Sequence, residues 1–137
     1  VIGQEGYDGE MFIKIAGAAA EGVIITTSLD RDSTDPLAQA FIQGFQKKSG
    51  YPADMVSAST HTAVLVLAEA MKQVDPSDKA ALRQAIASTS INAATGNISF
   101  NKLGEVRKSV QVQVVRDGSW HHFAVISDPV LLAPPEE

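Results

Sequence analysis

The stretch from Ala63 to Met71 constrains the fold more than any other part of the sequence, because Glu69 is its only polar residue. The residues just before it, Ser57 to Thr60, offer several N-caps, so we expect a helix here. A helix that is apolar nearly all round has to lie beneath other elements. The sequence therefore predicts a layered protein with this helix in its core.

Helices alternate with short β-branched segments in the rest of the chain. Apolar residues recur at helical spacing from Met11 to Ala19, and Gly22 ends that helix before a strand at Val23 to Thr27. The same signals predict a helix from Asp35-Pro36, a candidate strand at Tyr51 to Val56, a helix starting at 75–78 and a short strand at 97–100.

The C-terminal third ends in a predicted β-hairpin. Val and Gln alternate from Val110 to Val114, Asp117-Gly118 supplies a turn, and the segment 120–126 returns as the partner strand. The expected fold class is α/β, with layered helices on a mostly parallel sheet and this hairpin at the end.

Composition limits the partners that the chain can have. Its 137 residues, 45% hydrophobic and 20% charged, match one ordinary globular domain. The 16 acidic and 11 basic residues are spread along the sequence, so no nucleic-acid surface is expected. There is no cysteine, and no apolar run approaches the roughly 20 residues that span a bilayer. Because the chain starts at Val1 without a signal peptide, we expect it to be part of a longer protein.

Glu5 lies in a turn among three glycines, Gly3, Gly6 and Gly9. If Val1-Ile2 ends a strand, this turn lies beyond its carboxyl end, where open α/β sheets bind ligands. The glycines either let a ligand approach the backbone or only satisfy the geometry of a turn with a solvated carboxylate. Their spacing is not a phosphate loop, since the Gly-Lys-Ser/Thr ending is absent.

Polar side chains crowd the start of the apolar helix, at Ser57, Ser59, Thr60, His61 and Thr62. Free N–H groups and the helix dipole at such a start favour an anion such as a carboxylate, which would pair naturally with an ammonium site. Ordinary N-capping would explain the same residues.

Catalytic, metal and cofactor sites are not expected. A hydrolase would use Ser57 or Ser59 with His61, but close neighbours on one element rarely align a nucleophile, its base and a third group. His121 and His122 are consecutive in an expected strand, so they point to opposite faces and cannot chelate one metal together.

Four segments form a recognisable series: Gln4-Glu5-Gly6, the stretch Ile15 to Val23 (IAGAAAEGV), Thr60 to Val64 leading to Leu67 to Met71, and Gly96 to Phe100. In this order they resemble the C-terminal part of the type I periplasmic solute-binding proteins, the Leu/Ile/Val-binding-protein-like receptors of ABC importers. The resemblance runs from residue 1 to about residue 126.

The resemblance implies a two-lobed α/β protein with a small solute held between the lobes. It places residues 1–27 in the second lobe, 28–103 in the first lobe, 104–128 in a hairpin of the second lobe and 129–137 in a loose tail. The chain would be one C-terminal fragment that contains parts of both lobes.

Ligand-binding residues are implied by the same resemblance. In branched-chain amino-acid members, the glutamate that matches Glu5 accepts the ammonium group of the ligand, and Gly6 and Tyr7 lie beside it. Thr60 and His61 are the other implied ligand-binding residues. The position of His61 is often tyrosine in amino-acid binders, and this departure leaves the solute open, since some relatives bind amides, urea or aromatic acids.

The implied function is that of a non-enzymatic substrate-binding component of an ABC importer for amino acids, branched-chain or similar small polar solutes. It would lie in the periplasm or be lipid-anchored on the outer face of the cytoplasmic membrane, with the importer's membrane subunits as partners. A cytoplasmic sensor on the same fold, binding an amide or related solute, is the alternative. We also expect the chain alone to associate as a dimer or larger, because apolar surfaces at Ala63 to Met71 and Val23 to Ile25 would lack partners.

Overall fold

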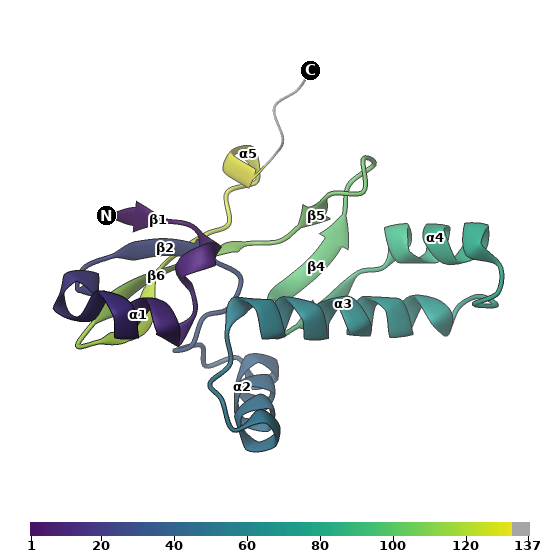
Figure 1. Cartoon of the computed structure of the whole chain (residues 1–137). Helices are drawn as coiled ribbons and strands as arrows, with labels where there is room; N and C mark the ends of the chain where they lie inside the picture. The colour runs from purple at the N-terminus through teal and green to yellow at the C-terminus, as the bar shows by residue number, and fades with distance from the viewer. Residues whose placement is uncertain (133–137) are drawn as a thin grey trace.

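The computed structural model describes residues 1–132, and their elements form two units (Figure 1). The sheet unit consists of β1 (Ile2–Gly3), η1 (Glu5–Tyr7), α1 (Glu10–Ala16), η2 (Gly17–Ala20), β2 (Ile24–Thr27), β6 (Val110–Arg116) and β7 (Ser119–Ile126). The helical unit consists of α2 (Pro36–Ser49), α3 (Met55–Met71), α4 (Lys79–Ser88), β3 (Ile91–Ala93), β4 (Gly96–Phe100) and β5 (Val106–Arg107). The chain crosses between the units first from β2 to α2 and again from β5 to β6.

The sheet unit contains a four-stranded sheet in the order β1-β2-β6-β7. Among these strands β1 and β2 are parallel, whereas β6 runs antiparallel to both β2 and β7. The α/β class and the terminal hairpin are confirmed. The pairing differs from the mostly parallel sheet that we expected, because the returning hairpin supplies half of the strands.

The β6–β7 turn forms at Asp117 and Gly118, as predicted. Both residues have positive φ, 49° and 70°, which is the two-residue turn that matches the twist of a hairpin. The carboxylate of Glu21 accepts a hydrogen bond of 3.1 Å from the Asp117 N–H. This contact ties the turn to the end of η2.

A compact core holds α1 and η2 against the sheet. Its buried members are Ala20, Val23, Ile25, Val115 and Trp120, and the partly buried Phe12, Ile13 and Ala16 pack against them. Full burial of one large aliphatic or aromatic side chain contributes about 1.5–3 kcal/mol. This core therefore fixes β2, the strand that leads into the first crossing, against β6 and β7.

The boundaries of α2 agree with the sequence signals. The Asp35 carboxylate accepts hydrogen bonds from the N–H groups of Leu37 and Ala38, at 2.8 and 3.1 Å, and Pro36 is the first helical residue. Gly50 ends the helix with φ of 77°, a left-handed conformation that favours glycine.

The α3 helix begins earlier than we expected. Met55 is its first residue, and Asp54 is the N-cap, whose carboxylate accepts a hydrogen bond of 2.7 Å from the Ser57 N–H. The strand expected at Tyr51 to Val56 was wrong, because Asp54 and Ser57 form a capping box that starts a helix there.

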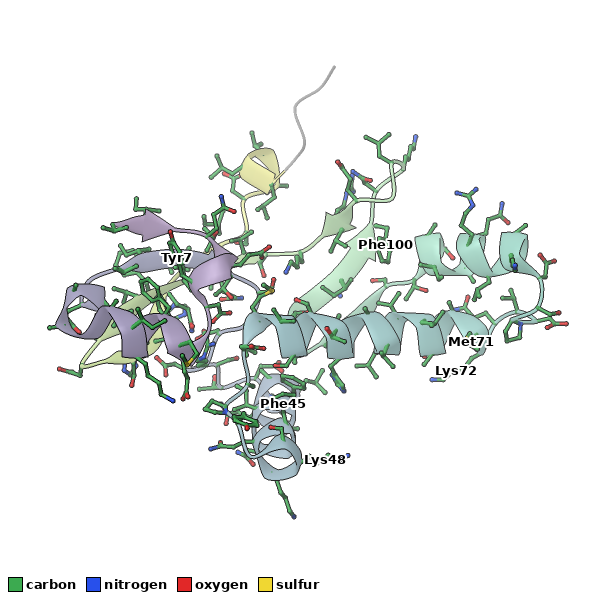
Figure 2. All side chains as sticks on the ribbon, in the orientation of Figure 1. Tyr7, Phe45, Lys48, Met71, Lys72 and Phe100 are labelled. Carbon is green, nitrogen blue, oxygen red and sulfur yellow. The ribbon has the colours of Figure 1, made fainter. Side chains whose placement is uncertain are left out.

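The apolar stretch of α3 is only partly buried. Val66 and Ala70 are buried, but Val64 is 59% exposed, and Leu65, Leu67 and Met71 are also exposed. Figure 2 shows Met71 and Lys72 at the far end of α3. The expected burial all round was therefore wrong within residues 1–132, since no described element covers these four side chains.

We expect the 137-residue chain, produced alone, to sediment as a dimer or larger at tens of micromolar. Exposed leucine, valine and methionine side chains on one helix form the kind of apolar surface that drives association. Analytical ultracentrifugation measures this directly. A single compact monomeric species at these concentrations would contradict it.

Two further features complete the fold. β3, β4 and β5 form an antiparallel sheet in that order, which lies beside α3 and α4. Of the expected loose tail 129–137, residues Pro129–Leu132 form the short helix α5, and 133–137 lie outside the described residues. No helix in the described part is both long enough and apolar enough to cross a membrane.

Candidate functional site

Glu5 is the first residue of η1, in the turn that directly follows β1, so it lies beyond the carboxyl end of that strand. The N–H groups of Tyr7 and Asp8 donate to the carbonyls of Gln4 and Glu5, each at 3.0 Å, and these bonds close the turn. The Glu5 side chain is exposed and takes part in none of the ion pairs within residues 1–132. A carboxylate held on a fixed turn with its oxygens accessible can accept hydrogen bonds from a cation.

Among Gly3, Gly6 and Gly9, Gly3 is the position at which an added side chain would clash with another residue. A Cβ at Gly3 would lie 2.3 Å from Cδ2 of Tyr7, because the tyrosine ring packs over the bare backbone. The same ring stacks on Phe12, with centroids 4.9 Å apart. A Cβ at Gly6 or Gly9 would meet no atom within 4 Å. The bare backbone at Gly3 therefore accommodates Tyr7, while Gly6 leaves open space beside Glu5.

Substituting Gly3→Ala is expected to displace the Tyr7 ring and to lower the free energy of unfolding. The loss of the stacked Tyr7–Phe12 pair should cost about 0.5–1.5 kcal/mol. Gly6→Ala is the matched control and should change stability by less than about 0.5 kcal/mol, since it meets nothing. Urea denaturation of both variants tests this, and equal stabilities would show that the contact is unimportant.

Lys108 brings a positive charge into the neighbourhood of Glu5. It lies in the second crossing, between β5 and β6, and its Nζ donates to Oγ of Ser28 in the first crossing. Burial lowers the pKa of the Lys108 ammonium below its ordinary value, and the Glu5 carboxylate offsets part of that shift. Both crossings therefore meet at this lysine, and the Glu5 carboxylate favours its charged form. Sequence reasoning missed it, because a lone lysine after a short strand carries no recognisable signal.

A hollow of about 350 Å³ opens beside Lys108, between α3, α4 and β4. Its walls are mostly apolar, and its polar members are Ser59, Thr62, Thr95 and Lys108. Thr62 Oγ1 and Thr95 Oγ1 are hydrogen-bonded to each other at 3.0 Å. Small-molecule sites commonly enclose roughly 300–1,000 Å³. Its size and its one cationic group therefore suit a small molecule.

A larger hollow of about 550 Å³ lies between α1, the loop before α3 and the β6–β7 turn. None of the five ligand-binding residues expected from the sequence lines it, and none lines the hollow beside Lys108. We place the candidate site at the crossings instead, because opposite charges meet there.

The structure does not bring Thr60 and His61 to the hollow beside Lys108. Thr60 is exposed on α3, and the His61 ring packs against Phe41 of α2, with centroids 5.0 Å apart. A packing role explains this position of His61. Solute contacts by Thr60 and His61, like those by Glu5, Gly6 and Tyr7, stay predictions.

Of the two readings of Ser57 to Thr62, an anion site and ordinary N-capping, the structure supports N-capping at the start of α3. These residues lie inside α3, and two of the N–H groups at its start have carboxylate partners within the chain. The Met55 N–H donates to Oδ2 of Asp8 at 3.0 Å, and the Ser57 N–H donates to Asp54. Two carboxylates of the protein thus occupy the positions that a ligand carboxylate would need.

The two consecutive histidines contact one loop of the first crossing. His121 Nδ1 lies 3.1 Å from Oδ2 of Asp32, and His122 Nδ1 lies 2.8 Å from Oδ2 of Asp30. Burial raises the pKa of Asp32, but the backbone N–H of His122 and the ring of His121 outweigh it and lower the pKa overall. Within residues 1–132 no three His, Asp or Glu side chains are placed to hold a metal ion. These histidines therefore attach β7 to the crossing.

Comparison with solved structures gives matches along nearly the whole chain. A leucine-binding protein of Thermotoga maritima is 29% identical with a TM-score of 0.84, over 94% of this chain and 37% of that one. A leucine-, isoleucine-, valine-, threonine- and alanine-binding protein of Brucella ovis, 22% identical with a TM-score of 0.80, covers the same shares. A solute-binding protein of R. palustris in complex with benzoate, 20% identical with a TM-score of 0.77 over 86% of this chain and 33% of that one, has the same fold.

The chain spans about 37% of the length of the first two of these structures. No curated protein matches it significantly. A family model described as periplasmic binding protein matches residues 1–119. Because that match covers most of the chain and the fold agrees with it, the chain belongs to the periplasmic binding protein family.

Proposed function

We propose that this chain is part of the substrate-binding component of an ABC transporter for amino acids, branched-chain or similar small polar solutes. The solute is held between the sheet unit and the helical unit, and no chemistry is performed on it. Family membership and the likeness to a leucine-binding protein support this proposal. The partners are the importer's membrane subunits, and the location is the periplasm.

The meeting of opposite charges at the crossings is the observation that carries the proposal. Glu5 projects from the sheet unit without an ion-pair partner among the described residues, and Lys108 lies close enough for the two charges to interact. An amino acid is a zwitterion, so its ammonium complements Glu5 and its carboxylate complements Lys108. A neutral or purely apolar solute would complement neither charge.

Closure of the two units on the solute supplies the signal to the transporter. Lys108 lies in the second crossing and Glu5 in the η1 turn of the sheet unit, so a solute bound to both contacts a segment that joins the two units. A ligand shifts such an equilibrium only by its different affinity for the two states. Contacts to Glu5 and Lys108 that form fully in the closed state provide that difference.

A thermal-shift screen of the full-length protein that contains this chain tests the proposal. The screen should include amino acids, amides and aromatic acids. A solute present at 100 times its Kd raises stability by about 2.7 kcal/mol, which is readily seen. We expect an amino acid to give the largest shift. Stabilisation by benzoate or other acids, with none by any amino acid, would contradict the proposed solute class.

A further inference from the structure

Asp8 is a buried carboxylate at the junction of the two units. Asp8 directly follows η1 and is only 2% exposed. Its backbone N–H donates to the Glu5 carbonyl at 3.0 Å. Burying an ionised carboxylate is costly unless charged and hydrogen-bonding partners surround it. The partners of Asp8 therefore show which segments of the chain this carboxylate holds together.

Most of these partners belong to the sheet unit or to the crossing that leaves it. The Thr27 hydroxyl, at the end of β2, donates to Oδ2 of Asp8 at 2.7 Å. The Arg31 guanidinium forms an ion pair with Oδ1 and also donates to the Asp8 carbonyl at 2.9 Å. The turn that contains Glu5 is thus attached to β2 and to the first crossing through one side chain.

Arg31 extends this attachment across the sheet. Its Nη1 donates to Oε1 of Gln113 at 2.8 Å, and Gln113, on β6, is 0% exposed. Gln113 Nε2 in turn donates to Asp30, which contacts His122 of β7. The inner part of this network is buried, where such hydrogen bonds are stronger than in water. Asp8 is therefore connected to β6 and β7 as well as to β2.

Among the hydrogen bonds and ion pairs within residues 1–132, one joins the Asp8 side chain to the helical unit. Oδ2 accepts the hydrogen bond of 3.0 Å from the Met55 N–H, at the first residue of α3. The helix does not need this carboxylate in order to form, because Asp54 already caps it and bonds the Ser57 N–H. The Asp8 contact lies between units, whereas the Asp54 contact is local.

We infer that Asp8 is a positioning residue that fixes the Glu5 turn to the start of α3 and so joins the two units. Thr27 at the end of β2 and Arg31 in the first crossing hold its side chain, and the Met55 N–H connects the same side chain to the helical unit. This inference goes beyond the proposed function and does not depend on which solute is bound.

Spin-label distance measurements test the inference in the 137-residue chain, which has no native cysteine. Cysteines introduced at the exposed Lys14 on α1 and Lys72 just beyond α3 would carry the labels, one on each unit. Labelled chain is mixed with a large excess of unlabelled chain, so that contacts between copies are not recorded. Asp8→Ala is compared with Asp54→Ala, since each substitution removes one carboxylate from the first turn of the same helix.

We expect Asp54→Ala to keep the distance distribution of the parent chain and Asp8→Ala to broaden and shift it. A simple capping role for Asp8 predicts that both variants behave alike, and that result would overturn the inference. If Asp8→Ala fails to fold, amide hydrogen exchange of the parent chain tests instead whether the contact between Asp8 and Met55 is formed. A Met55 amide that is protected as strongly as the Ser57 amide supports the contact, and a Met55 amide that exchanges freely overturns it.

Discussion

Replacing Glu5 by glutamine in the full-length protein is expected to weaken binding of an amino-acid solute by about two orders of magnitude or more, at about 1.4 kcal/mol per factor of ten. In a closed cleft the carboxylate and the solute ammonium form a charge-assisted hydrogen bond from which water is largely excluded. Removing one partner of such a pair leaves the other charge buried and costs roughly 3–5 kcal/mol. Isothermal titration calorimetry of the two proteins gives the ratio of their Kd values.

Glu10→Gln is the matched control for this substitution. Glu10 is also an exposed glutamate, at the start of α1, and it makes an i,i+4 ion pair of 3.7 Å with Lys14. Its replacement changes the charge of the chain by the same amount close to the same turn. We expect the Kd to stay as in the parent protein. If Glu5→Gln and Glu10→Gln behave alike, Glu5 is only a solvated turn residue.

Arg31→Met is expected to lower the free energy of unfolding, and this is the second large effect. The substitution leaves the Asp8 carboxylate buried without the guanidinium that faces it. Breaking a buried ion pair from one side costs roughly 3–5 kcal/mol. We expect the lower end of this range, because the Arg31 side chain is 19% exposed and water can enter the space that it leaves. Denaturation by urea, monitored by circular dichroism, measures the change.

Two further variants separate the charge effect from the loss of side-chain packing. Arg83→Met, on the exposed surface of α4, should change stability by less than about 0.5 kcal/mol. Adding Asp8→Asn to Arg31→Met removes the uncompensated charge and should restore part of the lost stability. A double variant that is less stable than Arg31→Met alone would show that the charge of Asp8 is not the cause.

Local signals in the sequence predicted the secondary elements whose caps are also local. Asp35-Pro36 with Gly50 and Asp78 before α4 each satisfy their hydrogen bonds within a few residues. Asp117 and Gly118 form the hairpin turn through their own positive φ values, which is also a local property. The start of α3 was misplaced although its capping box of Asp54 and Ser57 is local, because we expected a strand at Tyr51 to Val56 instead. The contact of Met55 with Asp8, 47 residues away, could not be predicted from any window of adjacent residues.

The exposure of apolar side chains on α3 could not be predicted from the sequence pattern either. The apolar composition of Ala63 to Met71 indicates that these side chains are suited to burial, but it does not state which segment covers them. In residues 1–132 the buried side of α3 contacts α4 and β3, and Val64, Leu65 and Leu67 remain exposed.

The candidate site was predicted in part. The position of the Glu5 turn beyond β1 follows from the rule for α/β sheets, and the structure places it there. Lys108 could not be found in this way, because it reaches Ser28 and the neighbourhood of Glu5 only through the fold. Gly3 appeared to be a residue for ligand access, yet its open space is filled by Tyr7.

The central claim is that Glu5 binds the ammonium group of an amino-acid solute at the junction of the two units. Calorimetry with the best amino acid from the screen, and with the same molecule lacking its amino group, tests this claim most directly. We expect the parent protein to bind the amino acid at least about two orders of magnitude more tightly than the analogue, which corresponds to about 2.8 kcal/mol. In Glu5→Gln this preference should largely disappear, because the two changes remove the same contact. Equal affinity of the parent protein for both molecules would contradict the account.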